Sequence, residues 1–429
     1  MFRKLSVFLI LVISCLFFLN SVPVLAQCTD CEDGLKIKSE FRWRGEADGR
    51  DFNSDTDMAM YSSMRARLGF MYKMDNISTF LQFQVPRTLG WNSGVLATTG
   101  TFDIHQAYMD WWLRCCEGAI IRIGRQELVY GDERLIGAVD WSNVGRTFDG
   151  ITVGYYQKDA FWFDLFMTKQ AERSNAYPGP QGMQKDDLFL GLWGAYTPMK
   201  LNFFLLHNRD AGTSGGDYYT TLSRHTLGIH YMNNYDDMNL KVLFDFAYQM
   251  GTMEAVRGTP LDIGAYMVLL GAWYDMSEMS KLFTSVGAGI DMTSGDDDAA
   301  DDKIAYFNNL YMTGHKWHGY MDYFTGLQMS GLRDIFVDLK WKCILAENAY
   351  WKFTFHNFAT TAEYATAGGT STALGNELDL TFNRKMNDVL SLDLGLGYFM
   401  PSEDWLGSNA DNAMWGFLQL NAEFGDMKK

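Results

Sequence analysis

Apolar and polar residues alternate with a period of two in many segments of this chain. In residues 36–44, Ile37, Phe41 and Trp43 occupy one set of alternate positions, and basic residues occupy most of the other set. The same alternation recurs in residues 64–73, 240–249, 334–342 and 390–397. Successive side chains of a β-strand point to opposite faces, so each segment predicts a strand with one apolar and one polar face. The chain is therefore predicted to be all-β.

Two all-β architectures fit this alternation, a water-soluble sandwich and a membrane barrel. The sandwich buries its apolar face, whereas the barrel turns it toward lipid and keeps polar groups in its lumen. The polar face here carries full charges, which a dry core does not hold unpaired. The segments run for about 9–12 residues, which is the span of a tilted membrane strand, and aromatic residues gather near their ends. These features favour a transmembrane β-barrel.

The connections between the segments alternate in length, as they do in outer-membrane barrels, where short periplasmic turns alternate with long outer loops. Eight short turns and nine long loops predict 18 antiparallel strands with both chain ends in the periplasm. The expected long loops include residues 251–264, 293–333 and 359–374. Residues 317–328 resemble a further strand, but a strand there would place two short turns in succession. We therefore assign them to the long extracellular loop 293–333.

The N-terminus has the pattern of a secretory signal peptide. Arg3 and Lys4 precede an apolar run over residues 5–19, and small or branched residues end the segment at Ala26. Residues 1–26 are predicted to be removed, leaving residues 27–429 as one barrel domain with a periplasmic N-terminal segment at 27–34. The net charge of −16 becomes more negative by two on cleavage, which argues against a nucleic-acid partner.

Five cysteines remain after cleavage, and the turn assignment places them all at the periplasmic end: Cys28, Cys31, Cys115, Cys116 and Cys343. They are interpreted as incidental thiols or as one or two disulfides. The alternatives are a metal or redox site, or docking of a periplasmic partner through Cys28, Cys31, Cys115 and Cys116. Enzyme motifs are weak, since Gly212–Gly216 matches G-x-S-x-G without the strand–turn–helix context that this motif needs. No catalytic residue or cofactor is expected.

The densest charged stretch of the chain covers residues 124–150. It interleaves acidic and basic residues and is punctuated by Gly124, Gly131, Gly137 and Gly145, which permit tight turns. We expect this loop to fold back into the lumen and form a constriction that determines which charges pass. The alternative is an ordinary loop held by ion pairs. The candidate residues of the lumen and solute path are Arg42, Arg44, Arg65, Arg67, Arg122, Arg125, Glu127, Arg134, Asp140 and Arg146.

Basic residues on the inward parity of the first five strands suggest a path for anions. Arginine binds carboxylates through paired donors of fixed geometry, and a row of cations inside a low-dielectric wall concentrates positive potential. The leading hypothesis is passive diffusion of anionic saccharides or small anions. In a general porin, by contrast, Glu40, Asp110, Glu127 and Asp132 would neutralise the row. A third possibility is a scaffold that docks a periplasmic or surface partner.

Two further features have alternative interpretations. Five aspartates in one outer loop, Asp296, Asp297, Asp298, Asp301 and Asp302, offer oxygen ligands for calcium, but they lack the ordered EF-hand spacing, so a solvated acidic loop explains them better. Trp91, Trp141 and Trp317 are candidates for stacking on sugar rings or for anchoring loops.

The charged stretch also resembles a known signature. Gly124-Arg-Gln-Glu-Leu, Tyr130-Gly-Asp-Glu-Arg-Leu-Ile-Gly and Arg146-Thr-Phe-Asp-Gly are similar to motifs of the alginate export family of outer-membrane porins. Residues 313–323, 375–380 and 397–401 agree with its long loop and C-terminal strands. The resemblance implies a monomeric 18-stranded barrel in the outer membrane of a Gram-negative bacterium, with a lumen of Arg, Lys and some Asp for uronate polymers. This chain is strongly acidic overall, and a fold does not determine a solute.

Overall fold

A computed structural model describes residues 33–90, 102–171, 187–210, 219–255, 260–298, 300–326, 329–367 and 369–425. The predicted signal peptide at residues 1–26, Cys28, Cys31, Trp91 and the 212–216 motif lie outside the described residues. The predicted domain boundaries therefore stay predictions.

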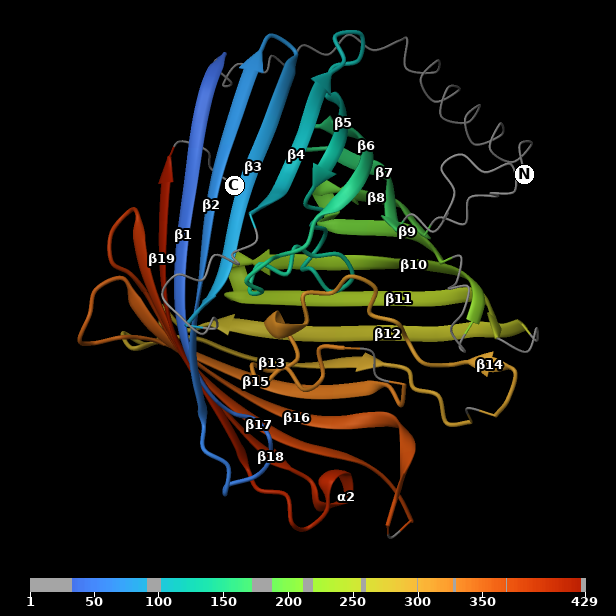
Figure 1. The fold of residues 1–429 in the computed structure, drawn as a ribbon, viewed down its shortest axis with the longest axis vertical. Coiled ribbons are helices and arrows are strands. Elements are labelled where there is room, and N and C mark those ends of the chain that lie inside the picture. The colour runs from blue at the N-terminus through green and yellow to red at the C-terminus, as the bar shows by residue number, and fades with distance from the viewer. Residues whose placement is uncertain are drawn as a thin grey trace.

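Eighteen antiparallel strands form a closed barrel, because β1 pairs with both β2 and β19 (Figure 1). A further strand, β14, has two residues and lies parallel to the end of β12. The strands are β1 (Gly34–Gly49), β2 (Ala59–Met74), β3 (Ile77–Leu89), β4 (Asp103–Trp112), β5 (Ala119–Gln126), β6 (Phe148–Gln157), β7 (Phe161–Ala171), β8 (Asp187–Tyr196), β9 (Leu201–Asp210), β10 (Tyr219–Tyr235), β11 (Leu240–Ala255), β12 (Pro260–Asp275), β13 (Phe283–Thr293), β14 (Lys303–Ile304), β15 (Leu332–Lys342), β16 (Ala349–Thr366), β17 (Gly369–Lys385), β18 (Leu390–Pro401) and β19 (Ala413–Gly425). Short helical turns are η1 (Thr197–Met199), η2 (Asp236–Met238), η3 (Gly314–Lys316) and α2 (Glu403–Leu406).

The two faces of the wall have the polarity that the alternation predicts. Phe41 and Leu270 are 44% and 51% exposed on the outside, as expected of side chains that face lipid. Arg65, on the opposite face of β2, is 1% exposed inside the barrel. The all-β barrel prediction is confirmed. Among the described residues, no helix is long and apolar enough to cross a membrane.

The eight short turns are confirmed, and β1 starts and β19 ends at the same end of the barrel as these turns. Two expected long loops are wrong. Most of residues 251–264 belongs to β11 and β12, and most of residues 359–374 belongs to β16 and β17. These strand ends are rich in Gly, Thr and polar residues, so their sequence lacks the apolar face that marks a strand in lipid. No barrel strand forms in the described part of residues 317–328, which confirms their assignment to the loop.

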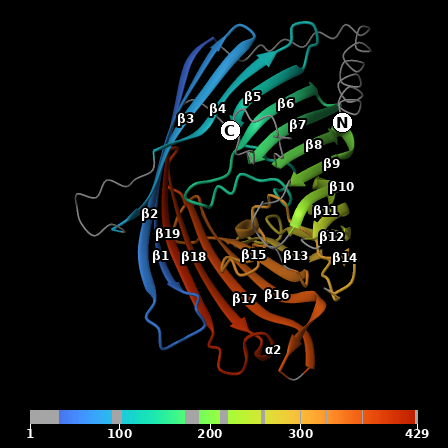
Figure 2. The ribbon, with the colours of Figure 1, turned by 45° about the vertical axis from the view of Figure 1, so that its right-hand side comes forward.

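Two long loops lie inside the ring of strands (Figures 1 and 2). The first inner loop comprises residues 127–147, between β5 and β6, and the second comprises residues 294–331, between β13 and β15. Apolar side chains of the first inner loop, including Leu135 and Ile136, pack against aromatic residues of β7, β8 and β9. Met321 and Phe324 of the second loop pack against Phe358, Phe399 and Trp415 of the wall on the other side. The interior of the barrel is thus partly filled by packed loop structure.

Candidate functional site: the constriction

Arginines of the wall hold the backbone of the first inner loop. Arg42 on β1 donates to the carbonyl oxygens of Asp140 and Ser142 at 2.6 and 2.8 Å. Arg65 on β2 donates to the same two carbonyl oxygens, at 3.0 Å each. Both arginines occupy the alternate positions of their strands whose side chains point into the barrel. The predicted constriction loop therefore lies against the predicted arginine row.

The Asp140 carboxylate gives the loop a second attachment. Its Oδ1 atom accepts hydrogen bonds from Arg65 at 2.9 Å and from Arg67 at 3.0 Å. Arg65 also pairs with Glu40, and Arg67 donates to the Gln84 side chain at 2.7 Å. Because guanidinium groups keep their charge and offer several donors in one plane, each of these arginines joins wall and loop at once.

Arg44 and Trp141 form a third attachment. Arg44 donates to Glu46 at 2.8 Å and to the Trp141 carbonyl at 2.9 Å, while its guanidinium lies 3.9 Å from the centre of the Trp141 ring. His315 of the second inner loop stacks on the same indole at 4.0 Å. A cation and an imidazole cannot share one face at these distances, so both faces of the indole are covered. Trp141 is therefore an anchor, and the interpretation that it stacks on sugars is wrong.

The two inner loops are bonded to each other. The Gly137 amide donates to the Tyr311 carbonyl at 2.9 Å, and the Tyr311 amide donates to Leu135 at 2.9 Å. Glu133 accepts bonds from the Thr313 hydroxyl at 2.8 Å and from Lys316 at 3.0 Å. These contacts make the loops one packed body inside the barrel.

Trp317 also joins the two inner loops. Its indole N–H donates to the Asp132 carbonyl oxygen at 3.0 Å, and the Arg134 guanidinium lies 4.1 Å from the centre of its ring. Trp317 therefore anchors the second inner loop to the first.

Arg134 and Arg146 have different partners. Arg134 pairs with Asp132 at 3.3 Å and with Asp291 of β13. Arg146 donates to three backbone carbonyls of the inner loops, including that of Met312 at 3.2 Å. Burial lowers the pKa of both guanidinium groups, but arginine titrates too high to lose its proton in a protein.

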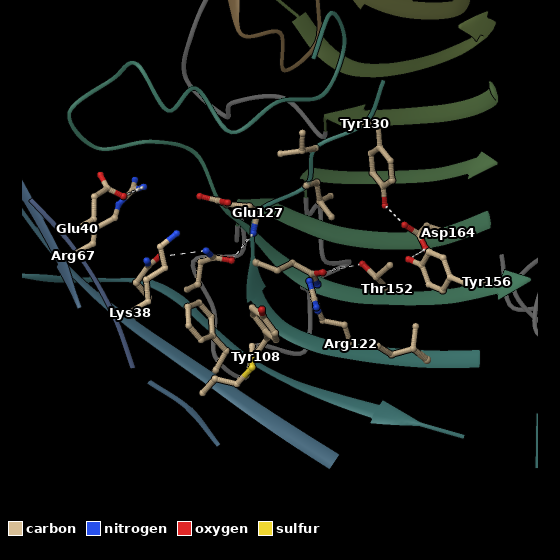
Figure 3. Close-up of a pocket in the computed structure, with 18 residues that line it drawn as sticks. Lys38, Glu40, Arg67, Tyr108, Arg122, Glu127, Tyr130, Thr152, Tyr156 and Asp164 are labelled. Atoms are coloured by element: carbon tan, nitrogen blue, oxygen red, sulfur yellow. Dashed lines mark hydrogen bonds and ion pairs between the residues drawn. The ribbon is translucent and has the colours of Figure 1, made fainter. Parts of the chain in front are cut away.

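A cavity of about 470 Å³ lies between the first inner loop and the strands β1 to β7 (Figure 3). Arg122 lies at its edge, with both carboxylate oxygens of Asp110 at 2.6 and 2.8 Å and the Tyr108 ring at 4.0 Å. Lys38 and Tyr130 also line the cavity. Cations, phenol rings and carboxylates thus surround a space of the size that a small solute occupies.

Glu127 begins the first inner loop and also lines the cavity. Its carboxylate accepts a hydrogen bond from Nε2 of His105 on β4 at 3.0 Å, and its backbone amide donates to the Gln106 side chain at 3.2 Å. Glu127 thus connects the loop to the wall as well as contributing charge to the cavity.

Arg125 is not a lumen residue, so that prediction is wrong. It shares the parity of Ile123 and pairs with Asp149 of β6 at 2.8 Å on the outer face. The alternation continues through Gly124 without a bulge, although Gly124 has a φ of +132° and an added Cβ would lie 2.2 Å from the Ala107 carbonyl oxygen. Arg122 and Arg125 of β5 therefore point to opposite faces of the wall, which the mixture of charges in residues 124–150 does not reveal.

The acidic loop does not form a calcium site in the described structure. Asp296, Asp298 and Asp301 accept backbone N–H bonds within their own loop at 2.8–3.2 Å. Asp297 and Asp302 do not join them in any group of three that could hold an ion among the described residues. Local turn formation therefore explains the cluster.

The described cysteines lie in short turns. Cys115 and Cys116 lie between β4 and β5, Cys343 lies between β15 and β16, and all three are free thiols. Docking of a partner through Cys28, Cys31, Cys115 and Cys116 stays a prediction, as does the monomeric state.

Comparison with known families identifies the chain. The model of the family named Alginate export matches residues 34–414. The chain belongs to the alginate export family. It is accordingly an outer-membrane channel of Gram-negative bacteria, and this family consists of channels rather than enzymes. No curated protein matches the chain closely.

Solved channel structures share the fold. OccAB1 of Acinetobacter baumannii superposes with a TM-score of 0.63 at 10% identity, covering 94% of this chain and 100% of that one. Pseudomonas aeruginosa OccK2, solved in complex with glucuronate, gives 0.59 at 11% identity over 92% and 98%. OpdK of the same organism, solved with vanillate, gives 0.57 at 12% identity over 91% and 99%. At these identities the likeness establishes the barrel fold alone.

Sequence reasoning missed the partners of the arginines. Tyr311, Thr313 and His315 hold the first inner loop from the second, and His105 binds Glu127. The resemblance at residues 313–323 was the available signal for the second loop, but no spacing rule links a loop to a segment more than 160 residues away.

Proposed function

We propose that this channel passes anionic saccharides of the uronate class, or small carboxylates, by passive diffusion. The observation that carries the proposal is the charge at the constriction. Arg42 and Arg146 both donate to backbone carbonyls, and among the described residues no carboxylate lies within ion-pair distance of either. Their charges therefore act on the space around the first inner loop, and a low-dielectric wall strengthens that potential.

The cavity beside the loop adds groups that suit a sugar acid. Arg122 and Lys38 supply positive charge, while Tyr108 and Tyr130 supply aromatic surface and hydroxyl groups. The OccK2 structure was solved with glucuronate and the OpdK structure with vanillate, both of which carry a carboxylate. The shared solute class of these distant barrels supports a carboxylate here.

A general porin is the second candidate, and a specific observation favours it. Five arginines of the lumen each have a carboxylate partner within 4.0 Å: Arg44, Arg65, Arg67, Arg122 and Arg134. If these pairs cancel the field of the whole row, the pore discriminates by size and not by charge.

The proposal is tested by the reversal potential of the refolded mature chain in planar bilayers under a KCl gradient. We expect anion selectivity in the wild type and a severalfold lower anion-to-cation permeability ratio in Arg42→Gln/Arg146→Gln. The matched control is Lys385→Gln/Asp388→Asn, which removes one charge of each sign from an exposed pair in a short turn and should leave the ratio nearly unchanged. Glucuronate should reduce the wild-type current more strongly than glucose does.

A wild-type permeability ratio that does not favour anions, and that the Arg42→Gln/Arg146→Gln substitutions leave unchanged, would leave the general porin as the function. A heat-dependent shift in gel mobility verifies that each variant forms the barrel.

A further inference from the structure

A buried cluster of titratable side chains lies where the first inner loop meets the wall. Asp132 belongs to the loop, His230 to β10 and Asp245 to β11. One potential ligand atom from each residue lies within 4.8 Å of the other two, and all three side chains are buried. The conduction path proposed above does not use this cluster.

One oxygen of the cluster lacks a donor. The Oδ1 atom of Asp245 lies 2.5 Å from Nδ1 of His230, which orients the imidazole. Its Oδ2 atom accepts no hydrogen bond from any residue that the structure describes, although the Asp245 side chain is only 3% exposed. A buried carboxylate oxygen without a partner is costly, and a bound cation would remove that cost.

The charges around the cluster also favour a cation. The carboxylates of Asp132 and Asp291 pair with the Arg134 guanidinium, and the Asp245 carboxylate lies near that guanidinium without pairing with it. Arg134 is occupied by Asp132 and Asp291, so its charge does not reach the free oxygen of Asp245 through a direct bond. With neutral imidazoles the group has an excess of two negative charges, which one divalent ion would balance.

We propose that Asp132, His230 and Asp245 bind one divalent transition metal of the zinc class. One imidazole nitrogen and two carboxylate oxygens form a donor set that suits Zn²⁺, and water completes the coordination. Ligand atoms of a tetrahedral Zn²⁺ ion lie roughly 3.4 Å apart, and the three ligand atoms here lie within 4.8 Å of one another, so each pair has to approach by no more than about 1.4 Å. The ion fastens the start of the constriction loop to β10 and β11.

The consequence is mechanical and does not depend on the solute. The Trp317 indole already donates to the Asp132 carbonyl oxygen, so a metal on the Asp132 carboxylate would fix both inner loops at one point. Removal of the ion should therefore increase fluctuations of the open channel without changing the sign of its selectivity.

The test is a titration of the untagged, refolded mature chain with Co²⁺, followed by visible absorption, and competition with Zn²⁺. Every cysteine is replaced by serine so that thiols do not bind the probe. We expect one ion per barrel, and a dissociation constant at least tenfold higher in Asp245→Asn and in Asp132→Asn. The matched control is Asp393→Asn on β18, which alters a carboxylate bonded by Asn383 and Asn421 at 2.6 and 2.9 Å and should bind as the wild type does.

Two results would overturn the proposal: no saturable binding at one ion per barrel, or equal affinity in all three variants. In either case the cluster is a His–Asp hydrogen bond without a metal. Should the Asn variants fail to form the barrel, X-ray absorption of the zinc-loaded parent decides. It must show nitrogen and oxygen ligands at about 2.0–2.2 Å, including one imidazole. The selectivity measurement above is independent, because it needs no metal.

Discussion

At the scale of single residues, the arginines of this lumen serve as structural donors as well as charges. Arg65 illustrates this, since one buried guanidinium bonds Glu40, the Asp140 carboxylate and two carbonyl oxygens of the loop. Lysine could not replace it, because an ammonium group lacks the planar set of five donors. The positive charge of the lumen and the attachment of the loop therefore depend on the same side chains.

Asp140 provides the corresponding prediction. Asp140→Ala removes the acceptor that Arg65 and Arg67 share, so we expect the loop to loosen and the barrel to lose about 1–2 kcal/mol of unfolding free energy. This is less than a fully buried pair would cost, because the Asp140 carboxylate is half exposed. Urea unfolding and single-channel noise measure the two effects. Asp388→Ala, at an exposed pair in a short turn, is the control and should change neither.

At the scale of elements, the two inner loops behave as one unit rather than as two separate coverings. Backbone bonds between residues 133–137 and 311–313 run in both directions, and Ile136 pairs with Tyr311 as in a short parallel ladder. Because each loop satisfies polar groups of the other, displacing one exposes the other.

Glu133→Ala should separate the loops. It removes the acceptor for the Thr313 hydroxyl and for Lys316, and bonds to a charged group are worth about 1.5–3 kcal/mol. Amide hydrogen exchange around Thr313 should therefore accelerate by roughly 10- to 100-fold. Glu117→Ala, an exposed turn substitution, is the comparison and should leave that exchange unchanged. An unaltered rate in Glu133→Ala would mean that apolar packing alone joins the loops.

The sequence determined the elements where lipid imposes a rule. Inside the bilayer one face of each strand must be apolar, so period-two alternation located the strands and the turn lengths gave their number. Beyond the bilayer both faces meet water, and the rule no longer applies. This is why the ends of β11, β12, β16 and β17 were expected to be loops.

The site was predictable only in part, for a related reason. Parity placed Arg42, Arg65 and Arg67 in the lumen, and the Gly-punctuated stretch indicated a loop that returns to it. Neither observation predicts which loop atoms the arginines bind, because the carbonyl groups of Asp140 and Ser142 lie 75–100 residues along the sequence from the arginines that donate to them. The cluster of Asp132, His230 and Asp245 was hidden likewise, although the alternation in residues 240–249 places Asp245 on the polar face of its strand.

At the scale of the whole molecule, the strands invert the usual arrangement of a soluble protein, since their apolar face points outward and their charged residues point into the barrel. Leu270 of β12 tests this most directly, because it lies on the outer face midway between Tyr266 and Tyr274, near the expected centre of the lipid band. Leu270→Arg should lower the unfolding free energy in lipid vesicles by about 2–4 kcal/mol, since the guanidinium must enter hydrocarbon.

Met279→Arg controls for the added charge itself. Met279 is more exposed than Leu270, at 73% against 51%. It lies in the short turn between β12 and β13, where the guanidinium can remain in water. Its cost should be about 0–1 kcal/mol. Equal destabilisation by the two substitutions would mean that Leu270 does not face lipid. The outward parity assigned to β12 would then have to be reversed, along with the inward positions of Leu269 and its neighbours. A large cost for Leu270→Arg alone would place the lipid band on the strands and leave the turns in water.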